Sequence, residues 1–284
     1  MSASKRVRVT EVIDGIRRER EDRVAIEEPL EIRIETADGP VPLAVTMRTP
    51  GDDLELAAGF LFSEGVIRSA SDVVALRHCM QVPPDRRDNT VTARLAPGAT
   101  VVATAMSRRF TVSSACGVCG VESLDALAQR GVQPVVATPV DAELLVSLPE
   151  RLRAAQPTFE RTGGLHAAGL FSPAGEVLCV REDVGRHNAL DKVLGWALMQ
   201  DLLPLAGHLV LVSGRTSFEL VQKSVCAGVG VLAGISAPSS LAVELAERFG
   251  LGLAGFVRDQ RMVLYAGATA AGVPPALSAQ PAAR

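Results

Sequence analysis

Residues 208–224 read HLVLVSGRTSFELVQKS. The four aliphatic residues at 209–212 are typical of a buried strand, and a helical pattern begins at Phe218, after a loop of small and polar residues. Strand, short loop and helix in this order form the repeating unit of proteins in which helices cover a sheet. The stretch therefore predicts an α/β fold for this half of the chain.

The same alternation continues through the second half of the chain. We expect strands at 165–172, 177–183, 229–236, 253–257 and 261–267, and helices at about 188–203 and from Ser239 or Ser240 onward. This order predicts one mixed sheet with helices on its faces, in a domain that spans residues 109–284. The tail after about residue 272 is rich in Ala and Pro, and we expect it to be disordered.

The first part of the chain has a different pattern. Residues 31–35 and 41–47 alternate apolar and polar side chains on either side of Gly39 and Pro40, which indicates a β-hairpin. A helical pattern follows over residues 54–62, and further strands are expected at 91–95 and 100–104. We therefore expect a smaller α+β domain over residues 1–108.

Composition excludes several function classes. The 284 residues carry a net charge of −3, so the chain offers no general basic field to nucleic acid. The N-terminus lacks the apolar core of a secretory signal, and Pro238 and several serines interrupt the longest uncharged stretch, 224–243. Five cysteines are too few for a disulfide scaffold. We expect a cytoplasmic protein that binds neither nucleic acid nor a membrane.

The strongest local signal is the loop SSACGVCG at residues 113–120. The residues directly after it have a helical pattern. It places Cys116 and Cys119 beside the first backbone N–H groups of that helix, where a thiolate is stabilised and its pKa falls. Such a thiolate can accept sulfur and pass it on. Cys116 and Cys119 are therefore the catalytic candidates.

Two other interpretations of the cysteine pair stay open. Together with His78 and Cys79 it could form a structural zinc site, although ligands adjacent in sequence fit a tetrahedron poorly and no second Cys-x-x-Cys exists. A thioredoxin-like redox site is less favoured, because the pair does not follow a recognisable βαβ start. We predict no metal ligands.

Four other segments suit an anionic, nucleotide-like ligand. A Gly-Gly pair before His166, the start of the helix at Arg186 and the loop after residue 212 offer backbone N–H groups and cations. The turn at 256–261 adds an aromatic ring and two arginines. Solvated loops and a surface hairpin are the simpler alternatives. The predicted cofactor-binding residues are Gly163, Gly164, His166, Arg186, His187, Ser213, Gly214, Arg215, Thr216, Phe256, Val257, Arg258, Asp259, Gln260 and Arg261.

Taken together, four motifs resemble the FdhD family of formate dehydrogenase accessory sulfurtransferases. They are SSACGVCG, TGGLHAA at 162–168, REDVGRHNALDK at 181–192 and SGRTSFELVQKS at 213–224. The resemblance runs in order from the N-terminal β-rich part to the strand expected at 261–267. The long polar motif at 181–192 is highly specific, whereas a Cys-x-x-Cys alone is not.

The resemblance implies a function. Family members take sulfur from a cysteine desulfurase as a cysteine persulfide and pass it to the bis-molybdopterin guanine dinucleotide form of the molybdenum cofactor, before that cofactor enters formate dehydrogenase. By this resemblance Cys116 would carry the persulfide, Cys119 would assist it, and residues 256–261 would contact the cofactor.

The resemblance also implies a cytidine-deaminase-like fold for the larger domain and a homodimer. The deaminase reaction itself is not expected, because Ala167-Ala168 follows His166 where deaminases have x-Glu, and Ala115 precedes Cys116 where they have Pro. Two rival functions remain. One is a non-catalytic molybdenum-cofactor-binding chaperone whose cysteines only dock or shield the cofactor, and the other is a zinc-stabilised binding module.

Overall fold

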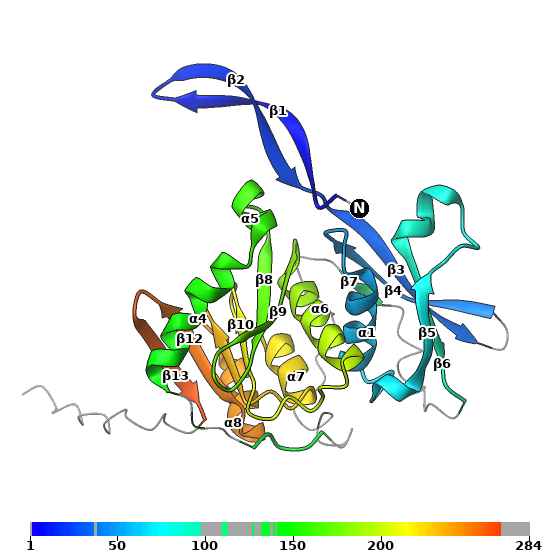
Figure 1. The fold of residues 1–284 in the computed structure, drawn as a ribbon, viewed down its shortest axis with the longest axis vertical. Coiled ribbons are helices and arrows are strands. Elements are labelled where there is room, and N and C mark those ends of the chain that lie inside the picture. The colour runs from blue at the N-terminus through cyan, green and yellow to red at the C-terminus, as the bar shows by residue number, and fades with distance from the viewer. Residues whose placement is uncertain are drawn as a thin grey trace, which may run out of the picture.

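The structure is a computed structural model that describes residues 2–36, 39–97, 110–112, 127, 132–136, 139 and 141–267. Within these residues the strands form three sheets, of two, five and six strands. Figure 1 shows the two-stranded sheet as an arm that extends away from the rest of the molecule. No helix in the described ranges has both the length and the apolar character needed to cross a bilayer.

The arm consists of β1 (Ser4–Ile13) and β2 (Ile16–Ala25), which pair antiparallel along their whole length. Asp14 and Gly15 connect them in a tight turn in which both residues have positive φ, a conformation that Asp-Gly sequences favour. Near its root the arm contacts the short helix α5 (Pro157–Thr162). Its charged side chains lie mainly in solvent.

The five-stranded sheet, which we call the first sheet, has the order β5-β6-β3-β4-β7. Its strands are β3 (Glu28–Thr36), β4 (Gly39–Arg48), β5 (Val73–His78), β6 (Thr90–Leu95) and β7 (Phe110–Val112), with short 3-10 helices η1 (Ala70–Asp72) and η2 (Pro84–Asn89) in its connections. The helix α1 (Asp53–Ser63) covers one face, where Ile32, Leu56 and Val91 share a buried core. The expected hairpin, helix and strand at 91–95 are confirmed. The strand expected at 100–104 lies outside the described residues.

The six-stranded sheet has the order β13-β12-β11-β10-β8-β9. Its strands are β8 (His166–Phe171), β9 (Val177–Asp183), β10 (Leu209–Val212), β11 (Val231–Gly234), β12 (Gly252–Arg258) and β13 (Arg261–Ala266). The strands β10, β11 and β12 are parallel, whereas β8, β9 and β13 run antiparallel to their neighbours. The predicted mixed sheet is confirmed.

Helices cover both faces of this sheet. One face packs against α6 (Arg186–Met199), α7 (Phe218–Cys226) and α8 (Ser240–Phe249), and the other packs against α4 (Ala142–Ala154). Asp141 accepts a hydrogen bond from the Glu143 backbone and caps α4, and Ser239 caps α8 in the same way through Ala242. The α/β class expected from the sequence is therefore correct.

Two glycines bring α1 and α6 into close contact, and Figure 1 shows these helices side by side. A Cβ atom added at Gly59 would overlap the carbonyl oxygen of Asp191, and one added at Gly195 would overlap that of Glu55. Only glycine permits backbones to approach so closely. This contact packs α1, the helix on the first sheet, against α6, a helix on the six-stranded sheet.

Gly59→Ala should lower the free energy of unfolding by at least about 2 kcal/mol, because the backbones must separate to admit the methyl group. The measurement is urea unfolding of the full chain. Gly164→Ala is the matched control, since a methyl group added there would have its nearest neighbouring atoms 3.8 Å away. Equal stability of the two variants would contradict the close backbone contact between α1 and α6.

Candidate functional site

The two catalytic candidates, Cys116 and Cys119, lie outside the described residues. Three other cysteines are described, and none of them forms a disulfide within the described residues. Burial raises the pKa of Cys179 to about 12, so this thiol stays protonated at neutral pH. Cys79 is also buried, and Cys226 is partly exposed.

The described residues contain no group of three or more His, Cys, Asp or Glu side chains placed to hold a metal ion. His78 lies at the end of β5 and Cys79 follows it, and both line a small pocket on the first sheet. The zinc alternative would need Cys116 and Cys119 as well, so it stays a sequence-based alternative.

Several residues that were predicted to bind the cofactor lie close together at the carboxyl ends of β10 and β11. His166 begins β8, the antiparallel neighbour of β10, and Ser213 follows β10 directly. The Ser213 hydroxyl accepts a 2.9 Å hydrogen bond from the Ala167 backbone, which fixes the start of β8 against the end of β10. A methyl group placed on Gly214 would lie 3.4 Å from His166 Nδ1 and 3.5 Å from Arg186 Cδ, so these three residues are neighbours.

A pocket of about 550 Å³ opens at this edge, and we call it the strand-end pocket. The predicted residues Gly163, Gly164, His166 and Ser213 line it. Its volume is within the range of small-molecule sites. Ligands of open α/β sheets commonly bind at the carboxyl ends of parallel strands, and this pocket lies at such an edge.

Part of the pocket wall comes from residues that were not predicted from the sequence. Arg153, Gln156 and Phe159 also line it, from the end of α4 and the start of α5. The Arg153 guanidinium carbon lies 4.4 Å from the centre of the Phe159 ring, a cation–π arrangement. An arginine and an aromatic residue shortly before the Gly-Gly pair were the available signal.

A buried carboxylate sets the position of Arg186 and His187, the first two residues of α6. Asp183 is 0% exposed and accepts hydrogen bonds from the Gly185 backbone and the Asn188 side chain, both at 2.9 Å. Its second oxygen lies 2.8 Å from Lys192 Nζ and accepts from the Thr49 backbone. Much of the charge in the motif at 181–192 is therefore structural.

The histidines at the site differ in environment. Burial lowers the pKa of His166, and the charges of Arg186 and His187 add to the effect, so His166 is neutral at pH 7. His187 Nε2 lies 3.3 Å from Ser217 Oγ and 3.7 Å from Glu219 Oε2. The His187 ring lowers the pKa of Glu219 to about 2, which keeps this carboxylate ionised.

Two buried polar atoms at this edge have no hydrogen-bond partner within the described part of the chain: Arg186 Nε and Thr216 Oγ1. Buried polar groups without partners are rare in native proteins. A ligand with acceptor oxygens would satisfy the arginine. Arg215, between Gly214 and Thr216, is exposed.

None of residues 256–261 lines the strand-end pocket, but the turn begins close to it, since the Phe256 backbone donates a hydrogen bond to Ser236, the residue after the pocket residue Ile235. Phe256, Asp259 and Gln260 have positive φ, and Arg258 pairs with Arg261 across the turn. The residues of the turn from 258 to 261 are exposed. Val257, in contrast, is a core residue with 0% exposure.

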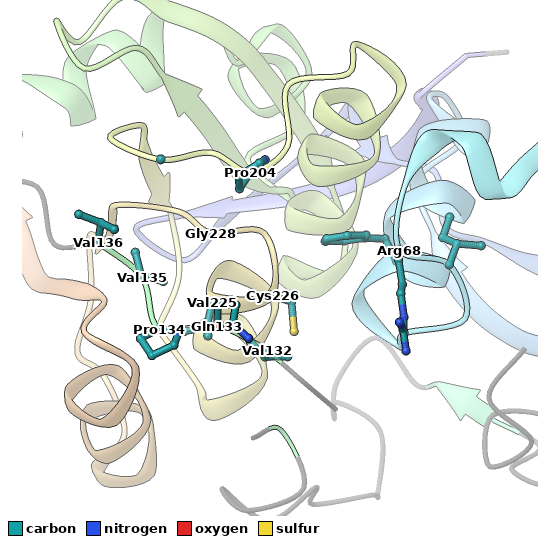
Figure 2. A pocket seen from close by; sticks show the side chains of 14 residues that line it. Arg68, Val132, Gln133, Pro134, Val135, Val136, Pro204, Val225, Cys226 and Gly228 are labelled. Carbon is teal, nitrogen blue, oxygen red and sulfur yellow. The ribbon is translucent and has the colours of Figure 1, made fainter. Parts of the chain in front are cut away.

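A second large pocket, of about 670 Å³, lies at the opposite edge of the same sheet. Its walls include Ala206 and Gly228, which precede β10 and β11. Figure 2 shows residues 132–136 along one side of this pocket, with the Cys226 sulfur and the Arg68 side chain also at its wall. None of the predicted cofactor-binding residues lines it.

Comparison with known proteins supports the resemblance seen in the sequence. The family model described as the FdhD/NarQ family matches residues 25–271. The chain belongs to the FdhD/NarQ family. Its cysteine pair, the strand-end pocket and the turn at 256–261 all lie within the matched residues.

Curated FdhD/NarQ relatives are similar over nearly the whole chain. The sulfur carrier protein FdhD of Streptomyces coelicolor is 50% identical over 270 residues, which cover 93% of this chain and 94% of the relative. The protein of the same name from Anaeromyxobacter dehalogenans is 49% identical over 255 residues, 86% of this chain and 87% of the relative.

A solved structure of similar fold supports the architecture. It is a crystal structure from Desulfotalea psychrophila of a protein proposed to be a formate dehydrogenase accessory protein. It superposes with a TM-score of 0.72 at 25% identity, over 94% of this chain and 98% of the other. The mixed α/β architecture is therefore shared across a large sequence difference.

Proposed function

We propose that this chain is a sulfurtransferase that carries sulfur on Cys116 and delivers it to the molybdenum cofactor used by formate dehydrogenase. The observation that carries the proposal is the family match over residues 25–271, which includes the Cys116-x-x-Cys119 pair. The curated relatives are named sulfur carrier proteins. Among the described thiols, Cys179 is a poor competitor, because its raised pKa leaves little thiolate.

The loading step follows from thiol chemistry. The Cys116 thiolate attacks the outer sulfur of a persulfide on a cysteine desulfurase, so a new S–S bond forms as the donor's S–S bond breaks. The donor cysteine leaves as a thiolate, and Cys116 now carries the persulfide. Cys119 assists this exchange.

The acceptor in this proposal is the bis-molybdopterin guanine dinucleotide cofactor, bound as a substrate. Gly163 lines the strand-end pocket, and Gly214 and Arg186 lie next to its His166. The Arg186 Nε, which has no partner within the described residues, suits an anionic group there. Because His166 is neutral, its role there is hydrogen bonding rather than charge. The turn at 256–261 would contact another part of so large a ligand.

The same proposal includes several further features. A cysteine desulfurase and formate dehydrogenase are the protein partners, and the chain acts as a cytoplasmic homodimer. The division into domains at 108/109 and the cytidine-deaminase-like fold of the larger one also stay predictions.

Guanosine diphosphate should bind the full chain, and Arg186→Ala should weaken that binding about tenfold or more, because a charge-assisted hydrogen bond is lost. Isothermal titration calorimetry measures the affinity. Arg18→Ala, on the exposed arm, is the matched control and should bind as the unmodified chain does. Arg258→Ala tests the turn independently. Failure of the nucleotide to bind, or equal affinity of the Arg186 and Arg18 variants, would remove the strand-end pocket from the proposal.

A further inference from the structure

A small pocket lies on the face of the first sheet that α1 does not cover. Strand residues alternate between faces, and Ile34, Val91 and Ala93 point toward α1. Their neighbours Glu35 and Thr92 therefore point to the other face, and Arg77 pairs with Thr92 across β5 and β6. The pocket has a volume of about 180 Å³, and no residue of the strand-end pocket lines it.

Two polar side chains of this pocket lack partners within the described residues. Glu35 Oε2 and Thr92 Oγ1 are buried and have no hydrogen-bond partner in the part of the chain that the structure describes. Thr92 is only 8% exposed. A buried polar group left without a partner costs about 1–3 kcal/mol, so two in one pocket indicate a polar guest.

The charged side chains that line the pocket indicate what kind of molecule it binds. Glu35 offers an acceptor for a cation or an N–H group, while Arg77 offers a guanidinium group to an anion. Thr92 can donate or accept, and His78 and Cys79 also line the wall. The described residues contain no group of three or more His, Cys, Asp or Glu side chains placed to hold a metal ion, and the opposite charges of Glu35 and Arg77 favour a small molecule as the guest.

The volume of the pocket limits the size of the molecule that it can bind. A volume of about 180 Å³ corresponds to the share of liquid occupied by roughly six waters. A nucleotide is too large for it, whereas a small amino acid fits. We propose that this pocket binds a free α-amino acid as a zwitterion, with its ammonium group at Glu35 and its carboxylate at Arg77 and Thr92.

The proposal can be tested apart from sulfur transfer, because the pocket shares no residue with the strand-end pocket and L-serine binding needs no sulfur donor. L-serine is the probe. Two analogues, here called the half molecules, each lack one of its charged groups: ethanolamine lacks the carboxylate, and 3-hydroxypropionate lacks the amine. Calorimetric titration of the full chain should give saturable binding of L-serine. Each half molecule should bind at least about tenfold more weakly, because one charge-assisted contact is lost.

Variants locate the site. Glu35→Gln and Thr92→Val should each weaken L-serine binding about tenfold or more, whereas Thr92→Ser keeps the hydroxyl and should bind normally. Glu143→Gln, an exposed position on α4, is the matched control and should also bind normally. Circular dichroism checks that each variant is folded, and Arg77→Gln replaces any variant that is not.

The proposal is overturned if L-serine gives no saturable binding, which would mean that water alone fills the pocket. It is also overturned if the half molecules bind as well as L-serine, or if the substitutions at Glu35 and Thr92 leave the affinity unchanged. Unchanged L-serine binding by Arg186→Ala is the expected result for a site separate from the strand-end pocket.

Discussion

Cells that carry Cys116→Ser in place of the unmodified chain should lose formate dehydrogenase activity to background. A serine hydroxyl cannot form a persulfide, so no sulfur reaches the cofactor. Cys119→Ser should retain part of the activity, because Cys119 assists the exchange without carrying the sulfur. The measurement is formate oxidation in extracts of cells that lack the natural gene for this chain and express each variant at equal level.

Cys226→Ser is the matched control for this experiment. Its thiol is partly exposed but lies in the pocket at the amino ends of β10 and β11, so activity should be unchanged. Substantial activity with Cys116→Ser or Cys116→Ala would favour the non-catalytic chaperone. Loss of bound zinc together with loss of folding would favour the zinc-stabilised module.

Lys223→Ala should lower the free energy of unfolding by about 3–5 kcal/mol, the usual cost of removing one partner from a buried ion pair. Lys223 Nζ contacts both carboxylate oxygens of Asp191 at 2.9 Å, and the Ser63 hydroxyl donates to the same carboxylate at 2.9 Å. Both charged side chains are more than nine-tenths buried. Without the lysine, Asp191 is an uncompensated buried charge.

The pH dependence of this ion pair has a defined sign. Burial acts to lower the pKa of Lys223, but the charges of Asp191 and Glu64 outweigh it and raise the pKa above its ordinary value. A raised pKa in the folded state stabilises the fold below the unfolded-state pKa, and this contribution is lost as pH rises through the folded-state pKa. Stability should therefore fall in strongly alkaline solution, and less so in the variant.

The double variant Lys223→Met/Asp191→Leu separates the charge effect from packing. It removes both charges and should recover much of the lost stability, because neither ion is then left unpaired. Lys5→Ala on the exposed arm is the control and should change the free energy of unfolding by less than about 0.5 kcal/mol. Urea unfolding measures all three. A Lys223→Ala chain as stable as the control would show that the pair is not buried as described.

The sequence patterns predicted the two main sheets because each has a buried face. Alternation identified the β3–β4 hairpin, and the aliphatic runs at 209–212 and 253–257 identified strands of the second sheet. The β1–β2 arm was missed. Its strands have charged residues on both faces, so they lack the one-sided apolar pattern on which strand prediction depends.

The candidate site was only partly predictable, for a physical reason. The motif at 181–192 suggested an anion site, yet its Asp183 is already paired with Asn188 and Lys192. Asp183 and Lys192 also hydrogen-bond to Thr49, which is remote in sequence. A sequence does not reveal which charged residues are paired across two layers. Arg153 and Phe159 were not expected at the strand-end pocket because the only signal for them was their place shortly before the Gly-Gly pair, and a sequence does not show that α4 and α5 pack beside this edge.

Peptide mapping by mass spectrometry tests the central claim most directly. The purified chain is incubated with a cysteine desulfurase and cysteine, alkylated, digested and analysed for added sulfur. The account predicts one extra sulfur atom on the peptide that contains Cys116, at the side chain of that residue. A chain that gains no sulfur, or gains it only on the peptides of Cys79, Cys179 or Cys226, would contradict the account.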